Sequence, residues 1–167
     1  MIKESIDTLS AGIAADPAKA KSKGIAATAK LVDGLRCEIS GFGDKPFASD
    51  MPSALGGKST APNPGWYLRS AMASCTATVI AMRAAKLGVE LSELEVTVDG
   101  ESDLRGILGM DERISAGQSA MRMKVKIAST GASPQALRDI VAWAEAHSPV
   151  SCTVRKAPAL SLEVDVA

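Results

Sequence analysis

One stretch of the chain decides the fold: residues 63–75, which read NPGWYLRSAMASC. Asn63 is suited to cap the start of a helix, and Pro64 to be its first residue. Apolar side chains then follow at alternating steps of four and three, so they share one helical face: Leu68, Met72, Cys75, Val79 and Met82. The stretch therefore predicts a long helix that carries the thiol of Cys75 on its apolar face.

On the amino-terminal side, the chain predicts a short helix and a β-hairpin. Isoleucines and a leucine recur at helical spacing until Asp16-Pro17: Ile2, Ile6, Leu9 and Ile13. Two strand-like runs, residues 25–32 and 35–42, flank Asp33-Gly34, a pair that is typical of two-residue hairpin turns. A loop rich in Gly, Pro, Ser and Asp then leads into the long helix.

On the carboxyl-terminal side, the long helix is expected to end at Gly88, and three strand-like runs follow it: residues 94–98, 107–114 and 121–127. Alternation in the first and third runs is typical of antiparallel strands with one buried face. A second helix begins at Ser133-Pro134 and ends near His147, and residues 160–166 predict a last strand. This order indicates an α+β class, with an N-terminal extension over residues 1–24 and one domain over residues 25–167.

Composition excludes several classes of protein. Of 167 residues, 46% are hydrophobic, which favours a globular core over disorder. Nineteen basic and nineteen acidic residues cancel, aromatic residues are only 3%, and no basic patch stands out, so nucleic-acid binding is not expected. No apolar run approaches the roughly 20 residues that cross a bilayer. The acidic N-terminus does not resemble a signal peptide, so a cytoplasmic protein without membrane association is expected.

The cysteines point to thiol chemistry or packing. Cys37, Cys75 and Cys152 do not make an even disulfide framework, and no CxxC motif is present. One histidine offers little for a metal, so neither a metal nor another cofactor is expected. In a reducing compartment, sparse cysteines are either packed or catalytic.

Three motifs carry a resemblance to a known family. Residues 63–75 resemble the central-helix signature of the OsmC/Ohr proteins, the osmotically inducible and organic-hydroperoxide-resistance proteins of bacteria. The loop with Asp50-Met51-Pro52 and Gly56-Gly57 resembles the segment before that helix. The run HSPVS at residues 147–151 resembles the second motif of the family. The resemblance covers roughly residues 25–167.

The resemblance implies a fold and a reaction. The fold would be an OsmC-like intertwined homodimer, with two long central helices, antiparallel sheets wrapped around them, and active sites at the dimer interface. A cysteine in the position of Cys75 would attack an organic hydroperoxide as a thiolate, in an oxidative-stress response. A second cysteine would condense with the resulting sulfenic acid, and a thiol or dithiol reductant, such as a lipoylated protein, would reset the pair.

This sequence departs from the pattern at two positions. Ser148 stands where the family has its resolving cysteine, and serine cannot form a disulfide. Gly65 stands where peroxidase members often have the glutamate that holds an activating arginine. Cys152 follows Ser148 by four positions and is the candidate replacement for the missing thiol. It comes within reach if the segment after Pro149 is helical, whereas an extended segment places it about 13 Å away.

Cys75 needs a cation if it is to react as a thiolate. It lies about three turns inside the predicted helix, beyond the reach of the helix dipole. Arg36, on the polar face of an early strand, is the first candidate for this cation. The other candidates are Arg69, Arg83 and Arg105.

Plainer interpretations remain beside these. Cys75 can be a small buried packing residue, and Cys37 alternates with apolar residues as core packing does. His147 is expected at an exposed helix end, with a role as a base as the alternative. Two hypotheses follow. The first is a thiol-dependent peroxidase with Cys75 as nucleophile and Ser148, Cys152 and Arg36 in its site. The second is an inactive OsmC-fold dimer that binds a small molecule or another partner.

Overall fold

The structure, a computed structural model, describes residues 1–166 and has the predicted α+β class. It divides into two compact units, one of residues 1–71 and one that begins at Met72. The predicted boundary between residues 1–24 and 25–167 is a different division, and it stays a prediction. Among the described residues, no helix is both long enough and apolar enough to cross a membrane.

The first unit contains a helix, a three-stranded sheet and the start of the long helix. Helix α1 (Ile2–Ala15) and a 3-10 turn (Pro17–Ala20) precede the sheet. Its antiparallel strands run in the order β1 (Thr28–Asp33), β2 (Arg36–Ser40), β3 (Phe47–Ser49). A second 3-10 turn, Ser53–Leu55, lies in the loop after β3.

The predicted hairpin forms, with its turn shifted by one residue. Asp33 pairs with Arg36, so Gly34 and Leu35 make the turn in place of Asp33 and Gly34. Gly34 has a φ of 55°, in the left-handed region that glycine enters at little cost. The glycine therefore sets the position of the turn.

Helix α2 (Pro64–Lys86) confirms the predicted long helix. Asn63 caps it, because its Oδ1 accepts a hydrogen bond from the Trp66 amide at 2.9 Å. Its buried stripe differs from the predicted one and consists of Met72, Thr76, Ile80 and Ala84. Leu68 and Met82, predicted to lie inside, are about two-fifths exposed.

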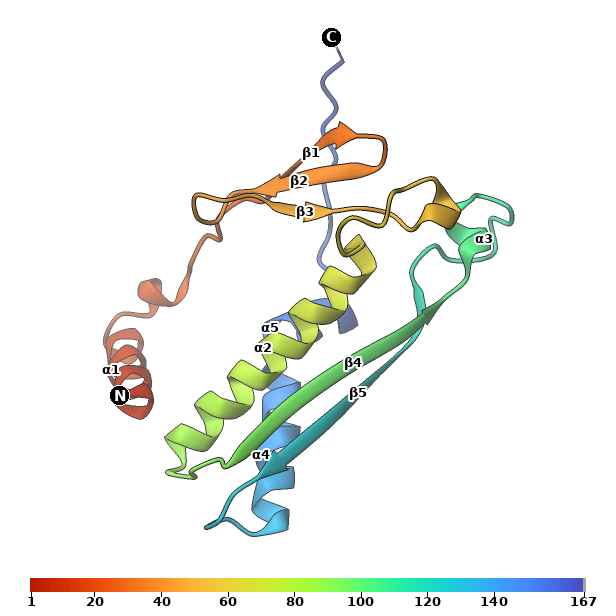
Figure 1. The fold of residues 1–167 in the computed structure, drawn as a ribbon. Helices are drawn as coiled ribbons and strands as arrows, with labels where there is room; N and C mark the ends of the chain where they lie inside the picture. The colour runs from red at the N-terminus through yellow and green to blue at the C-terminus, as the bar shows by residue number, and fades with distance from the viewer. Residues whose placement is uncertain (167) are drawn as a thin grey trace. The chain divides into compact units, whose positions relative to one another are not determined.

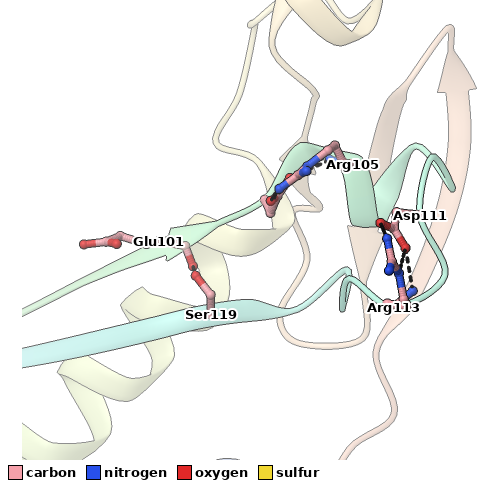
Figure 2. A network of polar contacts seen from close by, with 6 residues as sticks. Glu101, Arg105, Asp111, Arg113 and Ser119 are labelled. Atoms are coloured by element: carbon pink, nitrogen blue, oxygen red, sulfur yellow. Dashed lines mark hydrogen bonds and ion pairs between the residues drawn. The ribbon is translucent and has the colours of Figure 1, made fainter.

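The second unit has a two-stranded antiparallel sheet, β4 (Glu93–Ser102) with β5 (Gln118–Ala128). The predicted strand over residues 107–114 is wrong: the connection holds a short helix, α3 (Leu104–Ile107), and turns. Asp103 accepts from the Arg105 backbone and guanidinium, and Asp111 does the same for Arg113 (Figure 2). These local pairs bend the chain and remove the extended backbone that a strand needs.

Helices α4 (Pro134–His147) and α5 (Pro149–Arg155) complete the second unit. Ser133 caps α4 as predicted, and its Oγ accepts from the Ala136 amide at 3.2 Å. The core joins α2, α4 and the apolar face of the β4–β5 sheet, with four buried residues at its centre: Ile80, Ala84, Ile140 and Ala144. Figure 1 shows the β4–β5 pair alongside α4 and the later turns of α2.

The predicted last strand does not form. Residues 157–166 have no regular structure, and the four apolar side chains of the alternating pattern are between 68% and 94% exposed: Leu160, Leu162, Val164 and Val166. The pattern has the period of a strand, but a strand needs a neighbouring edge to supply its hydrogen bonds. We call residues 157–166 the carboxyl-terminal arm.

Candidate active site

The candidate site lies in the second unit, where α2 meets the junction of α4 and α5. Cys75 is half-buried on α2, and Ser148 is the residue between α4 and α5. The Ser148 hydroxyl donates a hydrogen bond to the Cys75 sulfur, with Oγ and Sγ 3.3 Å apart. The structure thus brings together two of the residues that the sequence indicated, from positions 73 residues apart.

Two further hydroxyls extend this contact inward. Thr76 Oγ1 donates to Ser148 Oγ at 3.3 Å and lies 3.4 Å from Ser151 Oγ. Thr76, Ser148 and Ser151 are all buried, with at most 1% of each residue exposed. We call these three residues the hydroxyl chain.

Helix geometry explains why the hydroxyl chain forms. Thr76 follows Cys75 directly and lies on the buried stripe of α2. Ser148 and Ser151 are three residues apart at the start of α5, so they share a face. Although Ser148 occupies the N-cap position of α5, its side chain caps no amide there, and its hydroxyl is available to the sulfur.

Sequence reasoning found Cys75 and Ser148 but missed Thr76 and Ser151 as site residues. Arg69, Thr76 and Arg83 fall seven residues apart, a spacing that is typical of one polar helix face, yet Thr76 is fully buried. A signal was present in the run SPVS, because serines three apart after a helix start share a face. Periodicity alone does not show that this face meets α2.

Cys152 is held by other groups. The segment after Pro149 is helical, which settles the open alternative between a helix and an extended chain. The Cys152 thiol donates to the Ala146 carbonyl at 3.2 Å, and Arg155 Nη2 lies 3.5 Å from its sulfur. Arg155 also pairs with Glu145. The two thiols therefore have different partners in this state, and their pairing stays a prediction.

The candidate cations have partners of their own. In the second unit, the Arg83 guanidinium lies 4.4 Å from the centre of the Trp143 ring, and its buried Nε has no hydrogen-bond partner among the described residues. Arg105 is paired with Asp103, and this pairing lowers the pKa of Asp103 to about 2. In the first unit, Arg69 is half-buried beside a cavity that Asp50 and Trp66 also line.

Arg36 belongs to a separate network in the first unit. Its Nη1 donates to Thr60 Oγ1 at 2.8 Å, and that hydroxyl donates to Asp50 Oδ2 at 2.8 Å. The buried Asp50 carboxylate also accepts from the amides of Met51, Lys58 and Thr60. The hydrogen bond from the Thr60 amide is the largest of the causes that hold the pKa of Asp50 below 3.8. Asp50 thus fixes the loop that contains Thr60, the residue to which Arg36 donates its hydrogen bond.

His147 is exposed at the end of α4, as predicted. Its ring stacks on Trp143, with centroids 4.0 Å apart and planes 11° apart. Its Nδ1 lies 2.7 Å from the Trp143 carbonyl oxygen. These contacts account for His147 as a structural residue at a helix end.

Comparison with known proteins identifies the family. A family model described as OsmC-like protein matches residues 56–163, about two-thirds of the chain and all of the candidate site. The chain belongs to this family. No curated protein matches the OsmC-like chain.

Solved structures share the OsmC-like fold. An OsmC-like protein from Mycoplasma pneumoniae has a TM-score of 0.68 at 16% identity, over 82% of this chain and 91% of that one. An organic hydroperoxide resistance protein OsmC from Legionella pneumophila has a TM-score of 0.59 at 19% identity, over 81% and 93%. The organic hydroperoxide resistance protein OhrB of Bacillus subtilis has a TM-score of 0.54 at 19% identity, also over 81% and 93%. These TM-scores establish the shared fold, and at such low identities they establish the fold alone.

Proposed function

We propose that this OsmC-like protein reduces organic hydroperoxides, with Cys75 as the reacting thiol. One observation carries the proposal: the half-buried Cys75 sulfur accepts a hydrogen bond from the Ser148 hydroxyl, in the helix that bears the family motif. A hydrogen bond donated to sulfur favours the thiolate over the thiol, and the thiolate is the nucleophile. The names of two relatives, both organic hydroperoxide resistance proteins, agree with this substrate class.

The proposed reaction begins at the sulfur of Cys75. The thiolate attacks the terminal oxygen of ROOH, so an S–O bond forms and the O–O bond breaks. The alkoxide leaves as ROH after it takes up a proton, and Cys75 becomes a sulfenic acid. Sulfur is oxidised by two electrons in this step, and the peroxide is reduced by two.

An external thiol then completes the turnover. One thiol attacks the sulfenic sulfur, releases water and forms a mixed disulfide, and a second thiol exchanges with it to regenerate Cys75. Ser148 contacts the Cys75 sulfur but has no sulfur of its own, so it cannot take the place of the external thiol. Cys152 is the internal alternative, and it requires release of its thiol from the Ala146 carbonyl.

Arg36 is our proposal for the activating cation. A guanidinium keeps its charge at any physiological pH, and the contact with Thr60 holds it in place. Replacement of Arg36 by alanine is expected to lower the rate with hydroperoxide. Replacement of the exposed Arg122, also an arginine on a β-strand, is the matched control, with no expected effect.

We further propose that the working form is a homodimer. The chain exposes 12298 Å² of surface. A compact monomer of 17.2 kDa exposes roughly 7,800 Å², and even two separate compact bodies of half that mass expose roughly 9,400 Å² together. The exposed area beyond these values is area that an extensive interface would cover. The carboxyl-terminal arm contributes apolar side chains to this exposed area. A reducing compartment such as the cytoplasm would supply the thiol.

The deciding experiment measures turnover of cumene hydroperoxide with a dithiol reductant. Wild type is compared with Cys75→Ser, Cys152→Ser and, as the control thiol, Cys37→Ser. We expect Cys75→Ser to fall to background and Cys37→Ser to match wild type. An unchanged rate in Cys152→Ser assigns resolution to the external thiol, and a strong loss assigns it to Cys152. A wild type that is as inactive as Cys75→Ser rejects the proposed function.

A second candidate function is small-molecule binding without turnover. Ser148 in place of the second cysteine, and Gly65 in place of glutamate, favour it. A groove of about 750 Å³ between β5 and α4 offers a candidate volume, with mostly apolar walls and one charge of each sign: Val125, Ile127, Leu137, Val141, Arg138 and Glu145. An inactive wild type in the turnover assay would direct attention to this groove.

A further inference from the structure

The hydroxyl chain consists of three buried hydroxyls linked in a row, and the one at its end, Ser148, contacts the Cys75 sulfur. A buried hydroxyl without a hydrogen bond is costly, so such groups are normally paired. Here Thr76, Ser148 and Ser151 find partners in one another and in Cys75. If these positions only packed against Cys75, apolar side chains would be sufficient there.

Proton counting gives the hydroxyl chain a direction. Each hydroxyl has one proton to donate. Ser148 gives its proton to the Cys75 sulfur, and Thr76 gives its own to Ser148. The contact between Thr76 and Ser151 must therefore be donated by Ser151. All three O–H groups then point, one after another, toward the sulfur.

We propose that Thr76 and Ser151 are positioning residues that orient the Ser148 hydroxyl as a donor to Cys75 and so favour its thiolate. Thr76 donates to one of the two lone pairs of Ser148 and so polarises the Ser148 O–H toward the sulfur. Ser151 does the same for Thr76, which keeps the donor direction fixed along the chain. This inference rests on the proposed function, since it assigns the means by which Cys75 becomes reactive.

The position of Cys75 makes such donors necessary. The thiol lies in the middle of α2, far from the positive end of the helix dipole. Partial burial of a thiol disfavours its charged form unless a donor or a cation compensates. Cooperative hydrogen bonds strengthen one another in a low-dielectric interior. Three linked hydroxyls therefore stabilise negative charge on the Cys75 sulfur more than one isolated serine would.

The test measures alkylation of Cys75 by iodoacetamide in the folded protein at pH 7, followed on the Cys75 peptide by mass spectrometry. This readout needs no peroxide turnover. Thr76→Val keeps the shape of threonine without its hydroxyl and is expected to slow alkylation about five- to tenfold. Thr76→Ser restores the hydroxyl and is expected to stay within about twofold of wild type.

Two further variants complete the set. Ser151→Ala removes the last hydroxyl with a small change in a helix, and it is expected to slow alkylation of Cys75 as Thr76→Val does. It replaces Thr76→Val in the test if that variant does not fold. Thr78→Val changes an exposed threonine two residues along the same helix and is expected to have no effect. Circular dichroism of each variant checks the fold.

The outcomes separate this inference from the proposed function. Slow alkylation in Thr76→Val with rescue by Thr76→Ser supports the role of the hydroxyl chain, whether or not the wild type turns over peroxide. Absence of peroxide turnover in the wild type would reject the proposed function but not this inference. The reverse pattern, with Thr76→Val at the wild-type rate and Thr76→Ser slowed, would show that the methyl group matters and would overturn the inference. Equal rates in every folded variant would overturn it as well.

Discussion

At the scale of single residues, serine and cysteine differ by one atom, and at Ser148 that atom lies 3.3 Å from the Cys75 sulfur. Sulfur is larger than oxygen and forms a bond to a second sulfur of about 2.05 Å when the two side chains face each other. The geometry at Ser148 places its side-chain terminus directly against the thiol. A cysteine at position 148 would place its sulfur beside that of Cys75, which is the first requirement for a disulfide.

This geometry gives a prediction for Ser148→Cys. We expect the variant to form a disulfide with Cys75 after one equivalent of organic hydroperoxide, so that free thiols fall from four per chain to two. Ser151→Cys is the matched control, because Ser151 contacts Thr76 in place of Cys75 and should keep its thiol. Thiol counts under denaturing conditions, with peptide mapping, make the measurement. Four remaining thiols in Ser148→Cys would contradict the geometry.

Part of the site was predictable residue by residue, and part was not. Cys75 and Ser148 stand in motifs that a linear sequence displays. Thr76 is not predictable in this way, because a residue beside an apolar stripe has the same sequence pattern whether solvent or another helix covers it. Its burial depends on α5, which begins 73 residues after it. Such a contact is a property of tertiary packing and leaves no periodicity in either segment.

At the scale of elements, the loop between β3 and α2 depends on one carboxylate. Asp50 accepts hydrogen bonds from three backbone amides and from the Thr60 hydroxyl. Gly57 lies so close to the Met51 carbonyl that a Cβ there would be 1.9 Å from its oxygen. The loop thus closes around Asp50 with no room for a side chain at its tightest point.

We predict a pH-dependent loss of stability in Asp50→Asn. The pKa of Asp50 is lowered in the folded state, so its stabilisation is complete above the ordinary value of 3.8 and disappears as the pH falls through the lowered value. The variant should therefore melt below wild type at pH 5–7, by a few degrees. The two melting temperatures should converge in acid. Asp44→Asn, in the exposed loop before β3, is the control. A difference that persists unchanged at the lowest pH would contradict the role of the carboxylate.

Local signals defined some elements well and others poorly. Asn63, Gly88 and Ser133 set helix ends through their own side chains or backbone freedom, so short sequence windows sufficed. Residues 107–114 were predicted as a strand because apolar side chains are frequent there, but aspartate–arginine pairs two residues apart favour turns (Figure 2). The sequence does not decide between a helix and an extended chain after Pro149, since proline is compatible with both a helix start and an extended segment.

At the scale of the whole molecule, the carboxyl-terminal arm is the clearest disagreement between pattern and structure. Its alternation of apolar and polar residues predicts a strand with one buried face, yet its apolar side chains are exposed. The alternating pattern predicts that one face of the segment is covered, but it does not indicate whether the same chain or another copy covers it. In the proposed homodimer, a second copy supplies the missing neighbour.

The arm therefore predicts the assembly state. We expect wild type to sediment at twice the 17.2 kDa of one chain, and Leu162→Asp to weaken the association at least tenfold, because it would place a charge on the buried face. Glu163→Gln changes the neighbouring residue on the opposite face and should leave the dimer unchanged. Analytical ultracentrifugation over a range of concentrations makes the measurement. A wild type that sediments as a single chain at every concentration would reject the dimer.

In the proposed homodimer the carboxyl-terminal arm packs only against a second copy of the chain, so the stability of the fold depends on protein concentration. Each tenfold dilution of a dimer whose subunits fold on association removes about 1.4 kcal/mol from its apparent stability. The melting temperature would then rise with protein concentration, and a mutation in the arm would behave like dilution. In a cell, a fall in expression would lower both the number of copies and the fraction of them that is folded.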